Sequence, residues 1–284
     1  MAHRNLHKKA GYTATGGPSG GYVSESSNVY DQTNIDTMEM VWGKGYMSAG
    51  GDVEVAQIVS GLDLRNMQIL DLGCGLGGAS VAMARDLGAK HVLGVDIDAG
   101  VLQRAARLVE EAGVGDCVTL QQIEPGPLPF DGNRFDLVYL NAVSCHFKDL
   151  RGFFAGIHRV LRSDGSLRGS DWFKLGDNEA FRDYDDLLRQ RGLNFFFVTR
   201  DEFESALRDS GFQSIRFVDR TEAVGQIASD GLRHVEKDLK DELVTRLGQN
   251  GYSIFHHWAV ARMNSLIHGG MGHGHFHARS SSTD

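Results

Sequence analysis

The chain has 284 residues and a formal net charge of −8, with 41% hydrophobic and 23% charged residues. This length suits one large domain, because single hydrophobic cores stop growing near roughly 250–300 residues. No apolar run approaches the ~20 residues that span a bilayer, and the basic residues form no stripe that would neutralise a nucleic-acid backbone. The composition therefore argues against a membrane protein, a fibrous protein and a nucleic-acid-binding protein.

The cysteines and the first residues bear on the compartment. Cys74, Cys117 and Cys145 form no C-x-x-C pair, and the start of the chain has no apolar export signal. An odd number of thiols without such a signal is typical of a reducing compartment. We therefore expect a cytoplasmic enzyme or binding protein that acts on a small molecule and has no nucleic-acid or membrane partner. Its oligomeric state is left open.

The composition changes along the chain. Residues 1–27 are rich in Gly, Ser and basic side chains and bury too little apolar surface to fold alone, so we expect a flexible arm. We assign 28–284 to one domain, with a helical lid at 28–60, a core at 61–171, and a substrate-lid insertion with the C-terminal strands at 172–278. Apolar residues recur at helical spacing from Tyr30 to Gly43, and a second short helix is expected at 53–59.

Short apolar runs alternate with amphipathic stretches in the core, which indicates a parallel sheet with helices on both faces. The expected strands are 67–70, 91–95, 118–121, 135–140, 166–170, 215–218 and 274–278. The expected helices beyond the lid are 79–87, 101–112, 150–161, 178–191, 200–210, 235–247 and 258–267. The predicted fold class is α/β: a Rossmann-like, doubly wound, seven-stranded sheet with an N-terminal helical lid and a helical insertion after the fifth strand.

A glycine-rich loop, LDLGCGLGG at residues 70–78, follows the first expected strand. Glycines permit positive φ and let a ligand approach bare N–H groups at a helix start. Gly73 and Gly75 also match the dinucleotide fingerprint, so NAD binding is a competing hypothesis. Asp71 would repel a pyrophosphate but attract a cationic amino-acid group. Asp96 ends the next strand, where it can accept hydrogen bonds from both ribose hydroxyls of either cofactor.

Together these residues resemble the S-adenosylmethionine site of class I methyltransferases. The resemblance implies that Gly73 and Gly75 lie under the methionine part of the cofactor and that Asp96 holds the ribose. It also implies that Glu124, after the third strand, accepts the adenine amino group and that Ile97 packs on the adenine. A structural glycine turn, a solvated loop glutamate and a core isoleucine are the alternatives.

The segment MVWGKGYMSAGG, residues 40–51, points to particular families within the class I methyltransferases. It is similar to the segment before the cofactor loop in phosphoethanolamine N-methyltransferases and in sarcosine and dimethylglycine N-methyltransferases. The resemblance implies that Tyr30 is a lid tyrosine over the donor methyl group and that Ser48 contacts the cofactor carboxylate. We expect the methionine side chains of this region, Met38, Met40 and Met47, to pack in the lid core.

The resemblance also implies a catalytic histidine. His146 follows the fourth strand at the family's position, where a neutral imidazole takes a proton from an ammonium substrate; capping of the next helix is the alternative. The family's orienting aspartate is replaced by Ala142, which favours a different acceptor or a non-catalytic binding protein. Asn141, also expected in the cofactor site, and Asp149 are candidate substitutes.

The expected acceptor site contains two arginines and a tryptophan. By the resemblance, Arg262 stands where the family has a phosphate-binding lysine, and Arg191 is near a second basic position. Trp172 replaces a pocket tyrosine and could face a methylated ammonium or fill the lid core. Arginines on the surface of amphipathic helices are the alternative.

We therefore expect transfer of a methyl group from S-adenosylmethionine to a small-molecule acceptor, with an amine favoured. The alternatives are O- or C-methylation of a larger, less polar metabolite and, as a third hypothesis, an NAD-dependent dehydrogenase. The histidine-rich end, with His273, His275 and His277, has the spacing of a metal site on a strand. We favour a plain last strand and expect no metal.

Overall fold

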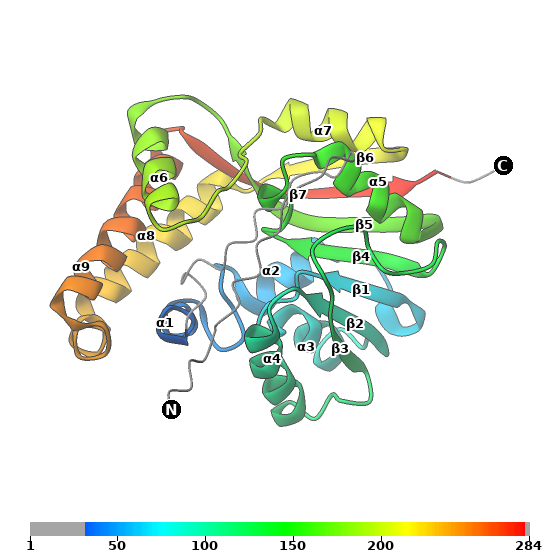
Figure 1. Ribbon diagram of the computed structural model, residues 1–284, viewed down its shortest axis with the longest axis horizontal. Helices are drawn as coiled ribbons and strands as arrows, with labels where there is room; N and C mark the ends of the chain where they lie inside the picture. Colours follow the sequence, from blue (N-terminus) through cyan, green and yellow to red (C-terminus); the bar gives the residue numbers. More distant parts are fainter. Residues whose placement is uncertain (1–31, 282–284) are drawn as a thin grey trace, which may run out of the picture.

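The structure, a computed structural model, describes residues 32–281. The predicted arm at 1–27 and the predicted lid residue Tyr30 lie outside the described residues. One sheet runs through the molecule in the order β3-β2-β1-β4-β5-β7-β6, and β7 is antiparallel to both of its neighbours (Figure 1). The predicted fold class is confirmed, whereas the domain boundaries stay a prediction.

The strands are β1 (Gln68–Leu72), β2 (His91–Asp96), β3 (Val118–Gln122), β4 (Phe135–Asn141), β5 (Leu161–Lys174), β6 (Phe212–Asp219) and β7 (Met271–Ser280). The helices are α1 (Gln32–Trp42), α2 (Gly51–Ile58), α3 (Gly78–Arg85), α4 (Ala99–Glu111), α5 (Leu150–Val160), α6 (Glu179–Gln190), α7 (Arg200–Asp209), α8 (Thr221–Lys237) and α9 (Lys240–Ile267), with short 3₁₀ turns η2 (Leu64–Asn66) and η3 (Ser144–His146).

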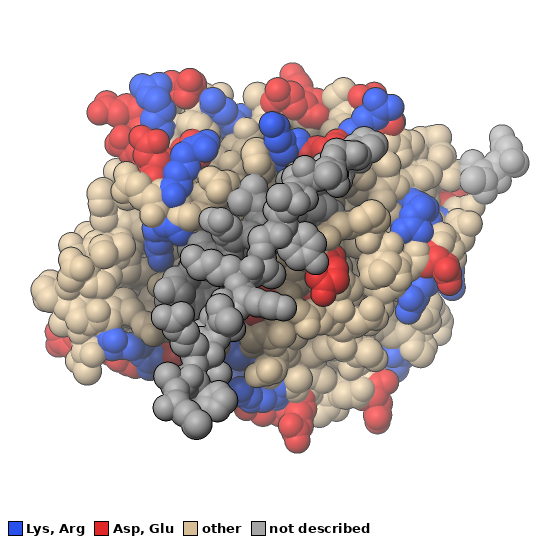
Figure 2. Space-filling view, viewed as in Figure 1, with Lys and Arg blue, Asp and Glu red and all other residues tan. Residues whose placement is uncertain are grey.

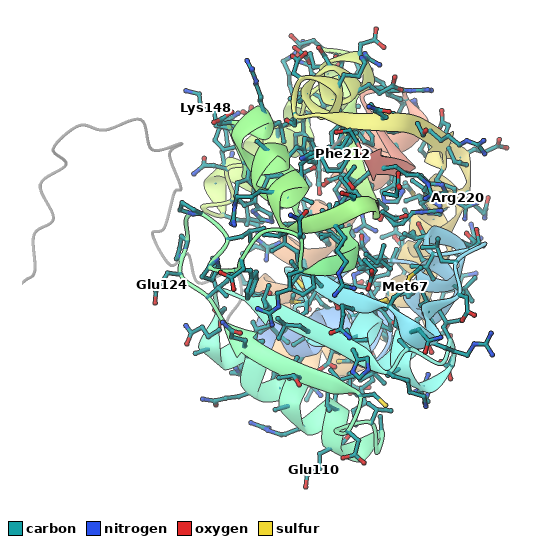
Figure 3. All side chains as sticks on the ribbon, turned by 90° about the vertical axis from the view of Figure 1, so that its right-hand side faces the viewer. Met67, Glu110, Glu124, Lys148, Phe212 and Arg220 are labelled. Atoms are coloured by element: carbon teal, nitrogen blue, oxygen red, sulfur yellow. The ribbon has the colours of Figure 1, made fainter. Side chains whose placement is uncertain are left out.

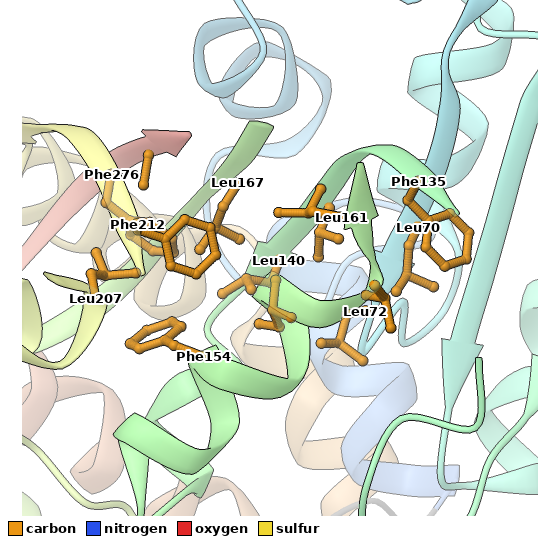
Figure 4. Packing of buried hydrophobic residues seen from close by; sticks show 14 of the residues in the cluster. Leu70, Leu72, Phe135, Leu140, Phe154, Leu161, Leu167, Leu207, Phe212 and Phe276 are labelled. Carbon is orange, nitrogen blue, oxygen red and sulfur yellow. The ribbon is translucent and has the colours of Figure 1, made fainter. Parts of the chain in front are cut away.

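Two hydrophobic cores lie on opposite faces of the sheet. On one face, side chains of β4 and β5 such as Leu140 and Leu167 pack against Phe154 of α5 and Leu207 of α7 (Figure 4). On the other face, strand residues such as Ile69 of β1, Val92 of β2 and Leu137 of β4 pack against α2, α3 and α4. Because successive side chains of a strand point to opposite faces, helices on both faces need nearly continuous apolar strands, which is the pattern of β1 and β4.

Several expected elements differ from the structure in extent, and the helix expected at 258–267 is only the last part of α9. Strand β5 is much longer than the expected 166–170. It begins at Leu161, which pairs with Phe135 of β4, and it extends past Ser170 because β7 pairs with it in nine consecutive positions from Ser166 to Lys174. The helix expected at 235–247 is wrong, since α8 ends and α9 begins inside that range. Val235 and Leu243 pack in one cluster across this break, so the apolar spacing continues although the helix does not.

Helix α1 is attached to α4 and α9 by a charged cluster. Arg104 of α4 pairs with Asp36 at 2.6 Å and with Glu39, and Arg246 of α9 also pairs with Asp36 at 3.2 Å. Ile35 is fully buried against the glycine loop. The α1 helix therefore contacts the core, the glycine loop and α9 at once.

The surface in Figure 2 carries basic and acidic side chains interspersed, with no broad patch of one sign among the residues drawn in colour. Among residues 32–281, no helix combines the length and the apolar character needed to cross a membrane.

Candidate active site

The glycine loop joins the carboxyl end of β1 to the start of α3. The Gly73 and Cys74 N–H groups donate to the Val95 carbonyl at 2.8 and 2.9 Å, and the Gly75 N–H donates to Asp96 Oδ2 at 3.0 Å. These bonds tie the loop to the end of β2 and set the Asp96 carboxylate directly beside it. Burial raises the pKa of Asp96 above its usual range.

Two of the glycines are required by the geometry. Gly73 and Gly75 have φ values of 71° and 53°, in the left-handed region that favours glycine. A Cβ atom would lie 2.7 Å from Val143 Cγ2 at Gly73 and 2.7 Å from Met47 Cε at Gly75. The loop is thus bare backbone packed between Met47, before α2, and Val143, in the turn after β4.

Asp71 lies inside the protein, beneath the loop. Its side chain is buried and accepts a hydrogen bond from Ser80 Oγ at 2.6 Å, which connects β1 to the first turn of α3. Burial raises the pKa of Asp71 to about 7. Its carboxylate therefore braces the loop from below, whereas the Asp96 carboxylate stands beside it.

Ile97 and Glu124 follow neighbouring strands of the sheet. Ile97 is 54% exposed, and its carbonyl accepts a hydrogen bond from Gln122 Nε2 at 3.0 Å. Glu124 is exposed on the loop after β3 and points away from the sheet (Figure 3). The alternative that Ile97 is a core residue is therefore wrong. Glu124 is an exposed loop residue.

Ser48, from the loop between α1 and α2, meets Asn141 at the end of β4. Asn141 Nδ2 donates to Ser48 Oγ at 3.4 Å, and Ser170 Oγ of β5 donates to Asn141 Oδ1 at 2.8 Å. Three elements thus converge on one amide at the carboxyl edge of the sheet.

His146 ends the short turn η3 and packs edge-on against Phe195, with ring centroids 4.7 Å apart. Part of the side chain is exposed, but its apolar surroundings disfavour the charged form and lower the pKa of His146 to about 4. Within residues 32–281 no carboxylate contacts the ring. Asp149 instead caps α5 by accepting from the Gly152 N–H at 2.9 Å, and Asn141 is engaged with the two serines. Neither candidate replaces the missing aspartate.

Arg262 of α9 is 5% exposed, so the alternative of a surface position is wrong. Its guanidinium carbon lies 4.5 Å from the ring centroid of Trp42, 5.2 Å from that of Trp258 and 5.8 Å from that of Trp172. These are the three tryptophans of the chain. In the described part of the chain, no carboxylate pairs with this guanidinium, and burial lowers the pKa of Arg262. We call Arg262 and the three tryptophans the arginine cage.

Arg191 adjoins the arginine cage. Its guanidinium carbon lies 5.8 Å from the ring centroid of Trp258, and its Nη2 donates to Asn34 Oδ1 of α1 at 3.4 Å. Two guanidinium groups therefore share one indole ring. The fold brings together α1, α6 and α9, which are far apart in the sequence.

The histidine-rich end is strand β7, as expected. His275 Nε2 lies 2.5 Å from Glu54 Oε1 of α2, and the His273 ring packs edge-on against Trp172 with centroids 4.6 Å apart. Among residues 32–281, no three His, Cys, Asp or Glu side chains are grouped so that they could hold a metal ion.

Sequence reasoning missed Trp42 and Trp258 as partners of Arg262, and it missed the buried Asp171 beside the His146 turn. The only available signal for the tryptophans was their scarcity, because they come from α1, β5 and α9. For Asp171 the signal was an acid within a stretch of β5 whose neighbouring residues are mostly buried.

The sheet order with one antiparallel strand, the glycine loop and the acid after β2 together define the class I methyltransferase fold. Residues 70–168 match the family model described as a methyltransferase domain. The predicted resemblance is also confirmed. The chain is 28% identical to phosphoethanolamine N-methyltransferase 1 of Zea mays over 243 residues, which are 82% of this chain and 46% of that protein. It thus spans about half the length of this plant relative.

Solved structures show the same fold. Phosphoethanolamine N-methyltransferase 2 of Haemonchus contortus, in complex with S-adenosyl-L-methionine, has a TM-score of 0.80 at 22% identity, covering 92% of this chain and 61% of that chain. A putative sarcosine dimethylglycine methyltransferase from Galdieria sulphuraria has a TM-score of 0.76 at 18% identity, covering 90% of this chain and 100% of that chain.

Proposed function

We propose that this protein transfers a methyl group from S-adenosylmethionine to a small amine that carries an anionic group, with a phosphorylated amino alcohol as the first candidate. The observation that carries the anionic group is the arginine cage, a buried cation without a carboxylate partner among residues 32–281. The names of the relatives support the methyl donor and the amine.

The residues of the glycine loop fit this cofactor. A ligand could approach the bare backbone of Gly73 and Gly75 beside Val143 and Met47, whose side chains stand 2.7 Å from where a Cβ atom would be. Asp96 could accept from the ribose hydroxyls, with Ile97 and Glu124 near the adenine and Ser48 and Asn141 near the amino-acid end. When bound, the cofactor supplies an electrophilic methyl group on its sulfonium. The role of Tyr30 stays a prediction, because Tyr30 lies outside the described residues.

The arginine cage supports binding of an anion. A buried charge without a partner costs several kcal/mol, so a ligand that neutralises it gains affinity. The guanidinium of Arg262 can hold two oxygens of a phosphate at once, and Arg191, which also lies near the Trp258 ring, can add a second positive charge. Trp172, which belongs to β5, attaches the cage to the sheet.

His146 supports proton removal from the acceptor. An ammonium group has no lone pair, so it must lose a proton before its nitrogen attacks the methyl group. The neutral imidazole of His146 can accept that proton or its hydrogen bond. A base with so low a pKa gives a small driving force, so we assign most of the acceleration to positioning and exclusion of water.

The test is release of S-adenosylhomocysteine from S-adenosylmethionine with phosphoethanolamine, with its mono- and dimethylated forms, and with sarcosine and dimethylglycine in separate assays. Ethanolamine is the matched control, because it has the same amine without the phosphate. We expect turnover of a phosphorylated acceptor and at least ~10²-fold less with ethanolamine. Equal turnover of the two amines would contradict the anionic acceptor, and no turnover of any amine would contradict N-methylation.

The chain's three tryptophans provide a second readout, because all of them surround Arg262. Binding of a phosphorylated acceptor should change the intrinsic tryptophan fluorescence, whereas ethanolamine should not. The cytoplasmic location and the absence of nucleic-acid partners stay predictions.

A further inference from the structure

Asp171, near the end of β5, is a buried carboxylate that the proposed reaction does not use. It is 1% exposed, and burial raises its pKa above the usual range. Its Oδ2 accepts hydrogen bonds from the Ser144 N–H at 2.8 Å and from the Ser144 hydroxyl. Its Oδ1 accepts from the Trp172 N–H at 2.8 Å. One side chain thus holds two segments of the site.

The first of these segments is the turn η3, which carries His146. The chain enters the turn through Ala142, whose φ of 55° is unusual for a residue with a side chain. The Cys145 carbonyl accepts from the Phe196 N–H at 2.7 Å, which connects the turn to the loop that packs Phe195 on His146. Ser144 is therefore the point where the turn is attached to the sheet.

The second segment is the wall of the arginine cage. Trp172 directly follows Asp171, and its ring lies against both Arg262 and His273. A displacement of the Asp171 carboxylate would move the His146 turn and this indole together.

We propose that Asp171 is a positioning residue, which places His146 by fixing the backbone of its turn and places Trp172 at the same time. This inference rests on the proposed function, because it assigns His146 and Trp172 to the acceptor site. In residues 32–281 the imidazole of His146 has no carboxylate of its own. The buried carboxylate acts one step away, on the main chain that carries the ring.

The test compares the Asp171→Asn variant with the wild type. The substitution keeps the size of the side chain but turns one acceptor oxygen into a donor, which leaves Ser144 or Trp172 without its acceptor. The control is Asp136→Asn, at the amino end of β4, where Asp136 Oδ2 accepts from the Gln68 N–H at 2.8 Å and pairs with Arg162 at 2.6 Å. The control disturbs a backbone hydrogen bond of the same kind, together with this ion pair, at the other end of the strand from the site.

Three quantities are measured for each variant: affinity for S-adenosylhomocysteine, turnover of phosphoethanolamine, and the pKa of His146 by NMR, with its signal assigned through His146→Asn. For Asp171→Asn we expect turnover to fall ~10²-fold, since a displacement of about 1 Å can cost that much. We expect the pKa of His146 to rise from about 4 toward its usual value as the turn opens to water, with unchanged cofactor affinity. Asp136→Asn should match the wild type in all three.

A folded Asp171→Asn variant with unchanged His146 titration and turnover would overturn the proposal. If Asp171→Asn does not fold, the Ser144→Ala variant is the test, because it removes only the hydroxyl donor to Asp171. We expect it to change turnover and the pKa of His146 in the same directions but by smaller amounts. If the wild type methylates no amine, the proposed function fails, but the His146 titration still tests the positioning role. A shift of the His146 pKa in Asp171→Asn alone supports the positioning role, and an equal shift in Asp136→Asn overturns it.

Discussion

Glu54 and His275 form a buried pair in which His275 Nε2 lies 2.5 Å from Glu54 Oε1, and each side chain is only 4% exposed. The pair joins α2, before the glycine loop, to β7, the last strand of the sheet. The guanidinium of Arg220 lies 3.7 Å from the second Glu54 oxygen. The imidazole of His275 lowers the pKa of Glu54 despite the opposing effect of burial.

We predict that Glu54→Gln destabilises the protein by about 2–4 kcal/mol, because a buried partner is lost while His275 stays buried. The measurement is the free energy of unfolding in urea at pH 7. Glu110→Gln, on the exposed surface of α4, is the control and should change stability by less than ~0.5 kcal/mol. Equal values for the two variants would show that the pair contributes nothing.

We predict that stability falls as the pH is lowered from 6.5 to 5. Burial lowers the pKa of His273 to about 3, so the unfolded chain takes up a proton below pH 6.5 while the folded protein does not. This depressed pKa stabilises the fold above pH 6.5, and the contribution decreases by about 2 kcal/mol between pH 6.5 and 5. The loss continues until the pH reaches the pKa of the folded state.

Urea unfolding at pH 6.5 and pH 5 measures this effect. His273→Asn should make the pH dependence shallower by about 2 kcal/mol over that interval. His91→Asn, at an exposed position at the start of β2, should leave the slope unchanged. A slope in His273→Asn equal to that of the wild type would contradict the assignment.

We predict that Asp96→Asn weakens binding of S-adenosylhomocysteine by at least ~10-fold. A carboxylate accepts from two ribose hydroxyls, and each hydrogen bond to a charged group contributes about 1.5–3 kcal/mol. Isothermal titration calorimetry measures the affinity, and Asp116→Asn, exposed before β3, is the control. Wild-type affinity in Asp96→Asn would place the cofactor elsewhere.

We predict that Arg262→Met raises the KM for phosphoethanolamine by ~10²-fold or more and leaves cofactor affinity within ~2-fold of the wild type. Loss of a desolvated charge partner costs about 2–5 kcal/mol of binding. The KM of Arg262→Lys should lie between those of the wild type and Arg262→Met, because an ammonium cannot hold two oxygens in a planar fork. Arg189→Met, which removes an exposed arginine of α6, is the control. An unchanged KM in Arg262→Met would remove the anionic group from the proposed acceptor.

We predict that Arg104→Met loosens α1, because it removes the cation that pairs with Asp36 and Glu39. Hydrogen exchange of residues 32–42 should become at least several-fold faster, while exchange in β4 stays unchanged. Arg107→Met, one turn away on the exposed face of α4, is the control. If exchange in 32–42 is equal in both variants, the Arg104 ion pairs contribute nothing measurable to holding α1, and its other contacts, such as Ile35 and the Arg246–Asp36 pair, are sufficient.

The sequence by itself determined the elements whose signal is local. The alternation of apolar runs with helical stretches predicted the sheet and its helices, because periods of 2 and 3.6 follow from the geometry of each element alone. The glycine loop and Asp96 were also found, since the turn needs positive φ at Gly73 and Gly75, and an acid after β2 falls at the same edge.

Only the tertiary structure decided the features that depend on distant segments. The length of β5 comes from pairing with β7, and the arginine cage comes from three tryptophans on α1, β5 and α9. Ala142 indicated that His146 lacked its usual partner, but no spacing could show that Asp171 holds the turn through Ser144. Such contacts are made by side chains far apart in the chain, so they exist only once the sheet and its helices have packed together.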